Sequence, residues 1–257
     1  MMRRSEGSGR SIRAFRTIII SAVPALLRPA LAWTGATLFV VSLAYFLIVY
    51  LTRFGTAVSD RGTAAAVIWN VTLFSAFALH HSVFARLPMR EWVARRVPAE
   101  LERSVYVWIA SLLFLAVCAA WRPVPGTAWQ AEGLALWLLR AAQAAALGLI
   151  ARSTAVLDVW DLAGLRPQAT GPRRSPQAEF QPRGPYGWVR HPIYAGWFLF
   201  VFAASPMTMT RLVFAIVSGA YLLIAIPFEE RTLRAASAGA YDRYRAAVRW
   251  RLVPGVY

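Results

Sequence analysis

The chain has 257 residues, of which 58% are hydrophobic, and all 28 of its basic residues are arginine against 12 acidic residues. Soluble domains are about half apolar, so this excess, concentrated in long runs, excludes an ordinary soluble protein and indicates an integral membrane protein. The formal charge of +16 is compatible with nucleic-acid binding, but arginines clustered between apolar runs orient a membrane protein and attract anionic lipid, so we expect no nucleic-acid partner.

Residues 1–29 combine a basic head with a short apolar run that Pro24 interrupts. A secretory signal has a similar composition, but here Arg28 and Pro29 precede the small residues and a full-length apolar segment follows at once. We therefore predict that residues 1–29 form an amphipathic lead on the cytosolic membrane surface.

Membrane-spanning helices need about 20 apolar residues each. Four runs of this length make up a predicted membrane frame over residues 30–157, namely 30–51, 63–85, 104–121 and 134–157. The run 192–205 is shorter, and we predict that it forms a helical hairpin with the returning run 211–228. The expected fold class is an all-α polytopic membrane protein with about six transmembrane segments.

Most of the arginines fall on one predicted side of the membrane, and few lie in the opposite loops, namely Arg53, Arg61, Arg122 and Arg211. The positive-inside rule then places both termini in the cytosol. It also places the loop with His191 and the tail with Glu229 and Glu230 on the same cytosolic side.

Residues 158–257 form the third predicted unit. The loop up to Arg190 is rich in Pro, Gly and Arg, and its middle, 168–181, lacks apolar periodicity, which is typical of a mobile flap. Residues 229–249 have the pattern of an amphipathic surface helix. Between these two segments, Arg190 and His191 precede Pro192, which favours the first turn of a helix. Two ionisable residues at the start of a membrane helix are costly to bury and therefore indicate a functional site.

Other polar residues in the apolar runs have less specific interpretations. His80, His81 and His191 lack carboxylates at ligand spacing, and the single Cys118 excludes a cysteine-built zinc site, so we expect no metal. Asn70 and His81 share one helical face, which favours hydrogen bonding between helices over a substrate pocket, although the pocket stays open. Asp161 is either a solvated end charge or part of the pocket rim.

An ordered set of motifs resembles a known superfamily. RHPxYxG at 190–196, EExxL at 229–233 and YxxY at 241–244 are similar to the integral membrane methyltransferases, which include isoprenylcysteine carboxyl and phospholipid methyltransferases. Matches at His81-Ser82 and further along the chain extend the resemblance to bacterial methanethiol S-methyltransferases; they lie at 102–107, 161–166 and 206–210. The sequence departs from that family at His80, Pro167 and 237–238. These departures bear on the identity of the methyl acceptor more than on cofactor binding.

The resemblance implies an S-adenosylmethionine-dependent S-methyltransferase whose cofactor binds between the hairpin and the tail. The implied cofactor-binding residues are Tyr186, Val189, Arg190, His191, Tyr194, Gly196, Glu229 and Glu230. The two glutamates would meet the ribose hydroxyls or the ammonium group, and Arg190 would meet the carboxylate. The candidate substrate-binding residues are Asn70, His81 and Asp161.

The implied chemistry suits a membrane pocket, because transfer from a sulfonium to a thiolate removes two opposite charges and is favoured by low polarity. Thiols ionise near pH 8.5 or higher, so a base or cation has to favour the anion, and His81, His191 and Arg231 are candidates.

The expected acceptor is a small thiol such as methanethiol, which would give dimethyl sulfide. A prenylcysteine carboxylate or lipid acceptor, and a non-enzymatic accessory protein associated with nitric-oxide reduction, remain alternatives. Membrane lipids are expected partners, and the sequence does not determine the oligomeric state.

Overall fold

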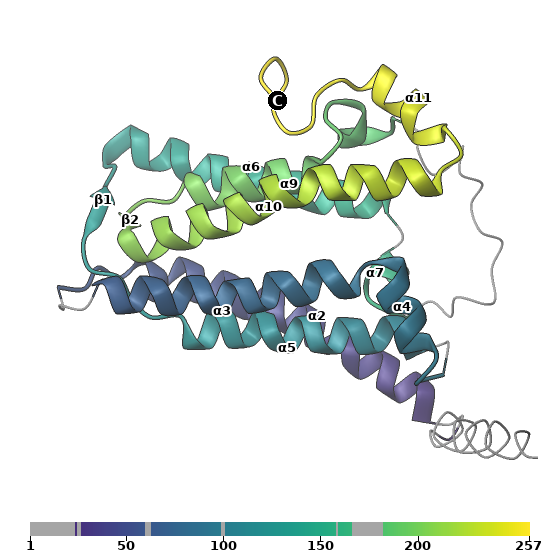
Figure 1. The fold of residues 1–257 in the computed structure, drawn as a ribbon. Helices are drawn as coiled ribbons and strands as arrows, with labels where there is room; N and C mark the ends of the chain where they lie inside the picture. Colours follow the sequence, from purple (N-terminus) through teal and green to yellow (C-terminus); the bar gives the residue numbers. More distant parts are fainter. Residues whose placement is uncertain (1–23, 25–26, 60–62, 99–100, 158, 166–181) are drawn as a thin grey trace, which may run out of the picture.

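A computed structural model describes residues 24, 27–59, 63–98, 101–157, 159–165 and 182–257 (Figure 1). Residues 1–23, 25 and 26 of the predicted lead at 1–29 and the middle of the predicted flap lie outside these residues, and residues 27–29 of that lead belong to α2. The helical elements of the described part are α2 (Leu27–Leu51), η1 (Arg53–Gly55), α3 (Thr63–Phe84), α4 (Leu87–Ala94), α5 (Glu102–Ala120), α6 (Gly133–Val156), α7 (Val159–Leu162), η3 (Gly184–Gly187), α9 (Pro192–Phe202), α10 (Met209–Ala236) and α11 (Ala240–Ala247).

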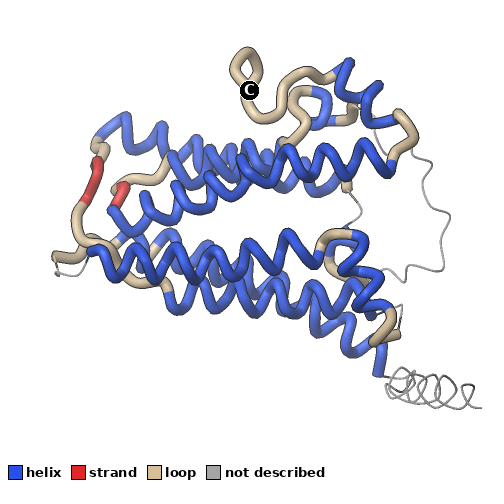
Figure 2. Tube along the Cα trace, in the orientation of Figure 1, coloured by secondary structure: helices blue, strands red, loops and turns tan. Residues whose placement is uncertain are grey.

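Five helices are long and apolar enough to cross a membrane, namely α2, α3, α5, α6 and α10. The apolar helix α9 has only 11 residues. The all-α polytopic prediction is therefore confirmed, with the hairpin formed by α9 and α10. A two-stranded antiparallel sheet pairs β1 (Thr127–Trp129), which precedes α6, with β2 (Met207–Thr208), which lies between α9 and α10. Figure 2 shows both strands at one end of the helices.

The long helices form two groups, with α2, α3 and α5 in one and α6, α9 and α10 in the other (Figure 1). Helix α6 packs along α9, and α2 packs along α5. One end of the protein carries η1 and the sheet, and we call it the sheet end. The other end carries α4, α7, η3 and α11, and we call it the α11 end.

An aromatic cluster joins the two groups towards the sheet end. The ring of Phe214 on α10 lies 5.4 Å from Phe46 on α2, 5.9 Å from Phe74 on α3 and 5.2 Å from Trp121 after α5. All four side chains are buried. Because apolar helices in lipid gain stability mainly from close packing, this cluster fixes α10 against the frame and so sets where the far end of α10 lies.

Arg211 lies inside this junction, although the sequence analysis assigned it to a loop on the opposite side of the membrane. It is 4% exposed, and its guanidinium donates hydrogen bonds to the backbone carbonyls of Tyr50, Leu51 and Pro206. These carbonyl dipoles compensate a charge that would otherwise be costly to bury. A Cβ at Gly55 would lie 2.5 Å from the Arg211 Nη2, so the site requires glycine.

The tail differs from the predicted single helix over 229–249. Helix α10 continues through Glu229 and Glu230 to Ala236, and a break with left-handed residues at Ala238 (φ 46°) and Gly239 (φ 82°) separates it from α11. The apolar pattern of the sequence continues through this break and therefore predicts one helix, whereas Gly239 adopts the left-handed conformation without steric cost. The acidic pair is therefore held near the end of a long apolar helix rather than on a surface helix.

Gly196 of α9 is expected to be required for the packing of α9 on α6. A Cβ at this position would lie 2.7 Å from Ile150 Cγ1 and 3.0 Å from the Ala146 carbonyl oxygen. We expect Gly196→Ala to destabilise the protein by about 1–3 kcal/mol through overpacking, measured by thermal unfolding in detergent. Gly148→Ala on α6 is the matched control, since a Cβ there meets nothing within 4 Å; equal effects of the two changes would refute this packing role.

Candidate active site

The segment entering α9 is held by the chain that follows α11. The backbone N–H groups of Arg190 and His191 donate to the carbonyls of Trp250 at 2.8 Å and Arg251 at 2.9 Å. Pro192 then occupies the first turn of α9, as the sequence predicts, where its missing N–H leaves no hydrogen bond unmade. These hydrogen bonds hold the RHP motif near the end of α10. Arg190 of the motif contacts Glu230 of α10, although forty residues separate them in the sequence.

Arg190, Glu230 and Arg251 form a buried ionic cluster that we call the Glu230 clamp. Arg190 Nε lies 2.8 Å from Glu230 Oε1, and Arg251 Nε and Nη2 each lie 3.3 Å from Oε2. Arg190 Nη1 also donates to the carbonyls of Val248 and Arg249. Arg190 is 8% exposed and Glu230 4% exposed. Both carboxylate oxygens of Glu230 are thus used inside the protein.

His191 lies between the two glutamates. Its Nε2 is 3.3 Å from Glu230 Oε1, and its Nδ1 is 3.8 Å from Glu229 Oε2. Its ring stacks on Tyr194 at 5.4 Å between centroids and 7° between planes. The Tyr194 hydroxyl donates to Glu229 Oε2 at 2.8 Å, while the Glu229 side chain remains 42% exposed. Unlike Glu230, Glu229 has a carboxylate that a ligand can reach.

Tyr186 of η3 lies near the same carboxylate. Burial, followed by the charge of Glu229, raises the pKa of Tyr186 to about 12. Its phenol therefore stays protonated at neutral pH and can act as a hydrogen-bond donor. Its backbone carbonyl accepts a hydrogen bond of 2.8 Å from the Tyr244 hydroxyl, which ties η3 to α11.

A second polar group comes from the frame helices at the same end. The Tyr106 hydroxyl of α5 lies 2.9 Å from His81 Nδ1 and 3.3 Å from the His81 carbonyl oxygen. Tyr221 of α10 lies beside the His81 ring, and its hydroxyl is 3.1 Å from Ser82 Oγ. His81, Ser82, Tyr106 and Tyr221 thus form one connected polar group at this end of the frame helices.

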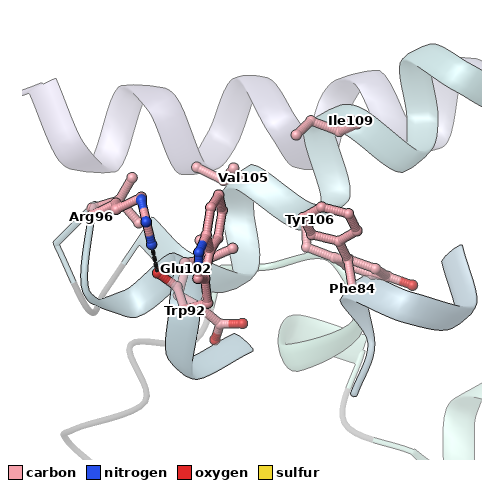
Figure 3. Close-up of a pocket in the computed structure, with 9 residues that line it drawn as sticks. Phe84, Trp92, Arg96, Glu102, Val105, Tyr106 and Ile109 are labelled. Carbon is pink, nitrogen blue, oxygen red and sulfur yellow. Dashed lines mark hydrogen bonds between the residues drawn. The ribbon is translucent and has the colours of Figure 1, made fainter. Parts of the chain in front are cut away.

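An apolar cavity of about 190 Å³ lies between α4 and α5 (Figure 3). Tyr106 forms one wall of it, and the other lining residues are Phe84, Trp92, Val93, Arg96, Val97, Glu102, Val105 and Ile109. His80 stacks on both Phe84 and Tyr106, at 4.6 Å and 5.9 Å between centroids. Neither of its ring nitrogens has a hydrogen-bond partner in the described part of the chain, although both are enclosed.

Comparison with known proteins decides the family. The signature of the isoprenylcysteine carboxyl methyltransferase family matches residues 170–235, which include His191 and the acidic pair. Methanethiol S-methyltransferase 2 of Bradyrhizobium diazoefficiens is 37% identical over 77% of this chain and 77% of its own length. The chain belongs to the methanethiol S-methyltransferase family.

Other members of this family are similar over a comparable length. The methanethiol S-methyltransferase of Mycobacterium tuberculosis is 36% identical over 78% of this chain and 90% of its own length. That of Crocosphaera subtropica is 35% identical over 74% of this chain and 76% of its own length. No solved structure matches. Family membership and the apolar helices establish a membrane methyltransferase and confirm the predicted resemblance.

The structure of this methyltransferase brings together several predicted site residues and separates others. Those at the α11 end around the acidic pair are Tyr186, Val189, Arg190, His191, Tyr194, Glu229 and Glu230. Arg231 is exposed and, like Arg86 at the end of α3, lies over the ring of Phe228 at 5.5 Å. Gly196 lies against α6, and the side chain of Asp161 lies outside the described part.

Asn70 is not brought to the other site residues. Its amide makes two 2.8 Å hydrogen bonds with the backbone of Arg122, and its side chain is fully buried towards the sheet end. Eleven residues of helix separate it from His81, which corresponds to about 16 Å along α3. This placement agrees with the structural hydrogen-bonding interpretation of Asn70.

Sequence reasoning missed three residues that the structure places at the site. Tyr106 and Tyr221 lie in apolar runs, where a tyrosine does not stand out. A buried phenol hydroxyl nevertheless needs a hydrogen-bond partner. That need is the signal that points to them. Arg251 gives no sequence signal, because only the return of the chain after α11 brings it to Glu230.

Proposed function

We propose that this methyltransferase transfers a methyl group from S-adenosylmethionine to a small thiol such as methanethiol, giving dimethyl sulfide. We further propose that the α11 end and both termini face the cytosol, which the arginine distribution supports. The observation that carries the proposal is the partly exposed Glu229 carboxylate, which Tyr194 and His191 hold beside the segment that enters α9. The similarity to methanethiol S-methyltransferases supports the choice of acceptor.

The residues around Glu229 fit S-adenosylmethionine. Tyr194 occupies only Oε2 of Glu229, so the remaining carboxylate surface can accept hydrogen bonds from an ammonium group or a ribose diol. The stacked rings of His191 and Tyr194 offer an aromatic face. When bound, the cofactor supplies an electrophilic methyl group on a sulfonium sulfur. Arg190 and Glu230 act in this proposal as positioning residues, because the Glu230 clamp uses most of their polar atoms.

His81 is the proposed base for the acceptor thiol. The Tyr106 hydroxyl satisfies both of its contacts when its O–H donates to the His81 carbonyl and its oxygen accepts from Nδ1–H. In this tautomer Nε2 carries the lone pair, because Tyr106 engages the ring through Nδ1. Nε2 could then accept the thiol proton as the sulfur takes the methyl group and the methyl–sulfonium bond of the cofactor breaks, which would leave a neutral thioether as the leaving group and the positive charge on His81. The rings of Phe77, Tyr106 and Tyr221 surround His81 and keep this region low in polarity.

Activity is tested with the full chain in lipid nanodiscs, methyl-labelled S-adenosylmethionine and a panel of methanethiol, longer alkyl thiols and a prenylcysteine. We expect labelled methyl sulfides in the headspace, because the aromatic rings around His81 suit a small apolar thiol, and no methyl ester on the prenylcysteine. Glu229→Gln should weaken cofactor binding in calorimetry about tenfold or more, since it removes a charge-assisted contact.

Two results would contradict the proposal in different ways. Methylation of the prenylcysteine alone would show that the acceptor is wrong while the cofactor is right. An absence of S-adenosylmethionine binding in both detergent and lipid would remove the enzymatic assignment and favour an accessory role.

A further inference from the structure

A second cavity, of about 390 Å³, opens at the α11 end beside the Glu230 clamp. We call it the arginine bowl, and its lining residues are Arg190, Arg245, Arg249, Trp250, Arg251 and Tyr257. His191, Tyr194 and Glu229 are not among them. The arginine bowl is therefore a separate feature from the proposed methyl-transfer site, although both touch the clamp.

The arginine bowl holds more positive charge than the described carboxylates neutralise. Glu230 is shared between Arg190 and Arg251. Asp242 is shared between Arg234, at 2.8 Å, and Arg245, at 3.4 Å, and is itself about half exposed. Arg249 is exposed and makes no ion pair with a described residue. Four guanidinium groups around one cavity thus attract an anion from solution.

One donor in the arginine bowl is enclosed without an acceptor. The Nε of Arg245 has no hydrogen-bond partner in the described part of the chain and is shielded from solvent. A buried donor left unpaired is destabilising, so this donor favours an acceptor bound next to Arg245. Guanidinium forks match the oxygens of a phosphate group in both geometry and charge.

The residues around the arginine bowl are typical of a membrane–water interface. Trp250 is 38% exposed, and the following apolar side chains Val253 and Val256 are 49% and 78% exposed. Indole rings and apolar side chains beside arginines favour the headgroup region of a bilayer, where anionic phosphates are concentrated.

We propose that the arginine bowl binds an anionic phosphate group, which a phospholipid headgroup supplies at the membrane surface. This inference does not depend on the proposed methyl transfer. Because Arg190 and Arg251 belong to both the bowl and the Glu230 clamp, the bound phosphate also supports the clamp from its outer side.

Native mass spectrometry of the detergent-solubilised full chain, titrated with phosphatidylglycerol or phosphatidylcholine, measures the binding. We expect phosphatidylglycerol to bind about tenfold more tightly. Each arginine near a headgroup contributes about fivefold in affinity, so the double variant Arg245→Gln/Arg249→Gln should lose this preference. Arg243→Gln is the matched control, because Arg243 lies on the same helix and does not line the bowl.

Further measurements identify the source of the phosphate and cover the case in which the double variant does not fold. If the double variant does not fold, the single change Arg249→Gln at an exposed side chain should still cost about fivefold. Inorganic phosphate that raises the unfolding temperature of the wild type alone, without selective lipid binding, would support the phosphate site with a soluble source. Equal binding of both lipids without any effect of phosphate would overturn the proposal. Equal losses in the Arg243 control, or displacement of the lipid by S-adenosylmethionine, would also overturn it.

Discussion

Glu230→Ala is expected to destabilise the protein by about 3–5 kcal/mol, the largest stability effect that we predict for a single side chain. The change leaves Arg190, which is 8% exposed, without its carboxylate partner, and it also removes a partner of His191 and Arg251. An unpaired buried charge costs far more than the net gain of the original pair. Thermal and denaturant unfolding in detergent measure the effect, and methyl transfer should be lost with it.

Asp242→Ala is the matched control for the clamp. Asp242 also pairs with two arginines at the α11 end, but its side chain is 48% exposed and its partners are partly exposed. Water and salt screen such a pair, so we expect a change below about 1 kcal/mol. Similar losses for Asp242→Ala and Glu230→Ala would show that the clamp has no special role.

His81→Gln is expected to lower kcat for thiol methylation by about 10²–10⁴-fold at pH 7, the loss typical of a removed general base. The defect should shrink by about tenfold for each pH unit up to the thiol pKa, because the acceptor then ionises without help. Headspace assays between pH 7 and 9 measure both effects. A merely structural role would lower the rate equally at every pH, and that outcome would exclude His81 as the base.

Two neighbouring variants sharpen the test of His81. His80→Phe keeps the stack between Phe84 and Tyr106 and removes only nitrogens without partners, so kcat should change less than about threefold. Tyr106→Phe removes the hydroxyl that fixes the His81 tautomer, and it should give a smaller loss than His81→Gln with the same pH dependence. A large loss in His80→Phe would point to His80 instead.

The two acidic residues of the EExxL motif have different surroundings, which explains why adjacent glutamates can serve different purposes. Successive residues on a helix point about 100° apart. Glu230 therefore faces Arg190 and Arg251, whereas Glu229 faces Tyr194. We propose that the first glutamate of the motif contacts the ligand and that the second holds the tail against α9.

The sequence by itself determined the membrane fold and identified the motif segments that meet at one end of it. Apolar runs of sufficient length predict helices in lipid because every backbone hydrogen bond must be satisfied within the segment. This rule predicted α2, α3, α5, α6 and α9 to within a few residues, whereas α10 continues to Ala236, well past its predicted end at 228. The RHPxYxG and EExxL motifs identified the residues that the structure gathers at the α11 end.

Only the tertiary structure decided which of these residues are free to act. The positions of Tyr106, Tyr221 and Arg251 depend on contacts between segments far apart in sequence, and local periodicity does not encode such contacts. Arg211 matched the pattern of a loop charge, yet backbone carbonyls from two other segments enclose it. Burial and pairing are properties of the packed chain, and they separate Glu229, which can meet a ligand, from Glu230, which is already paired.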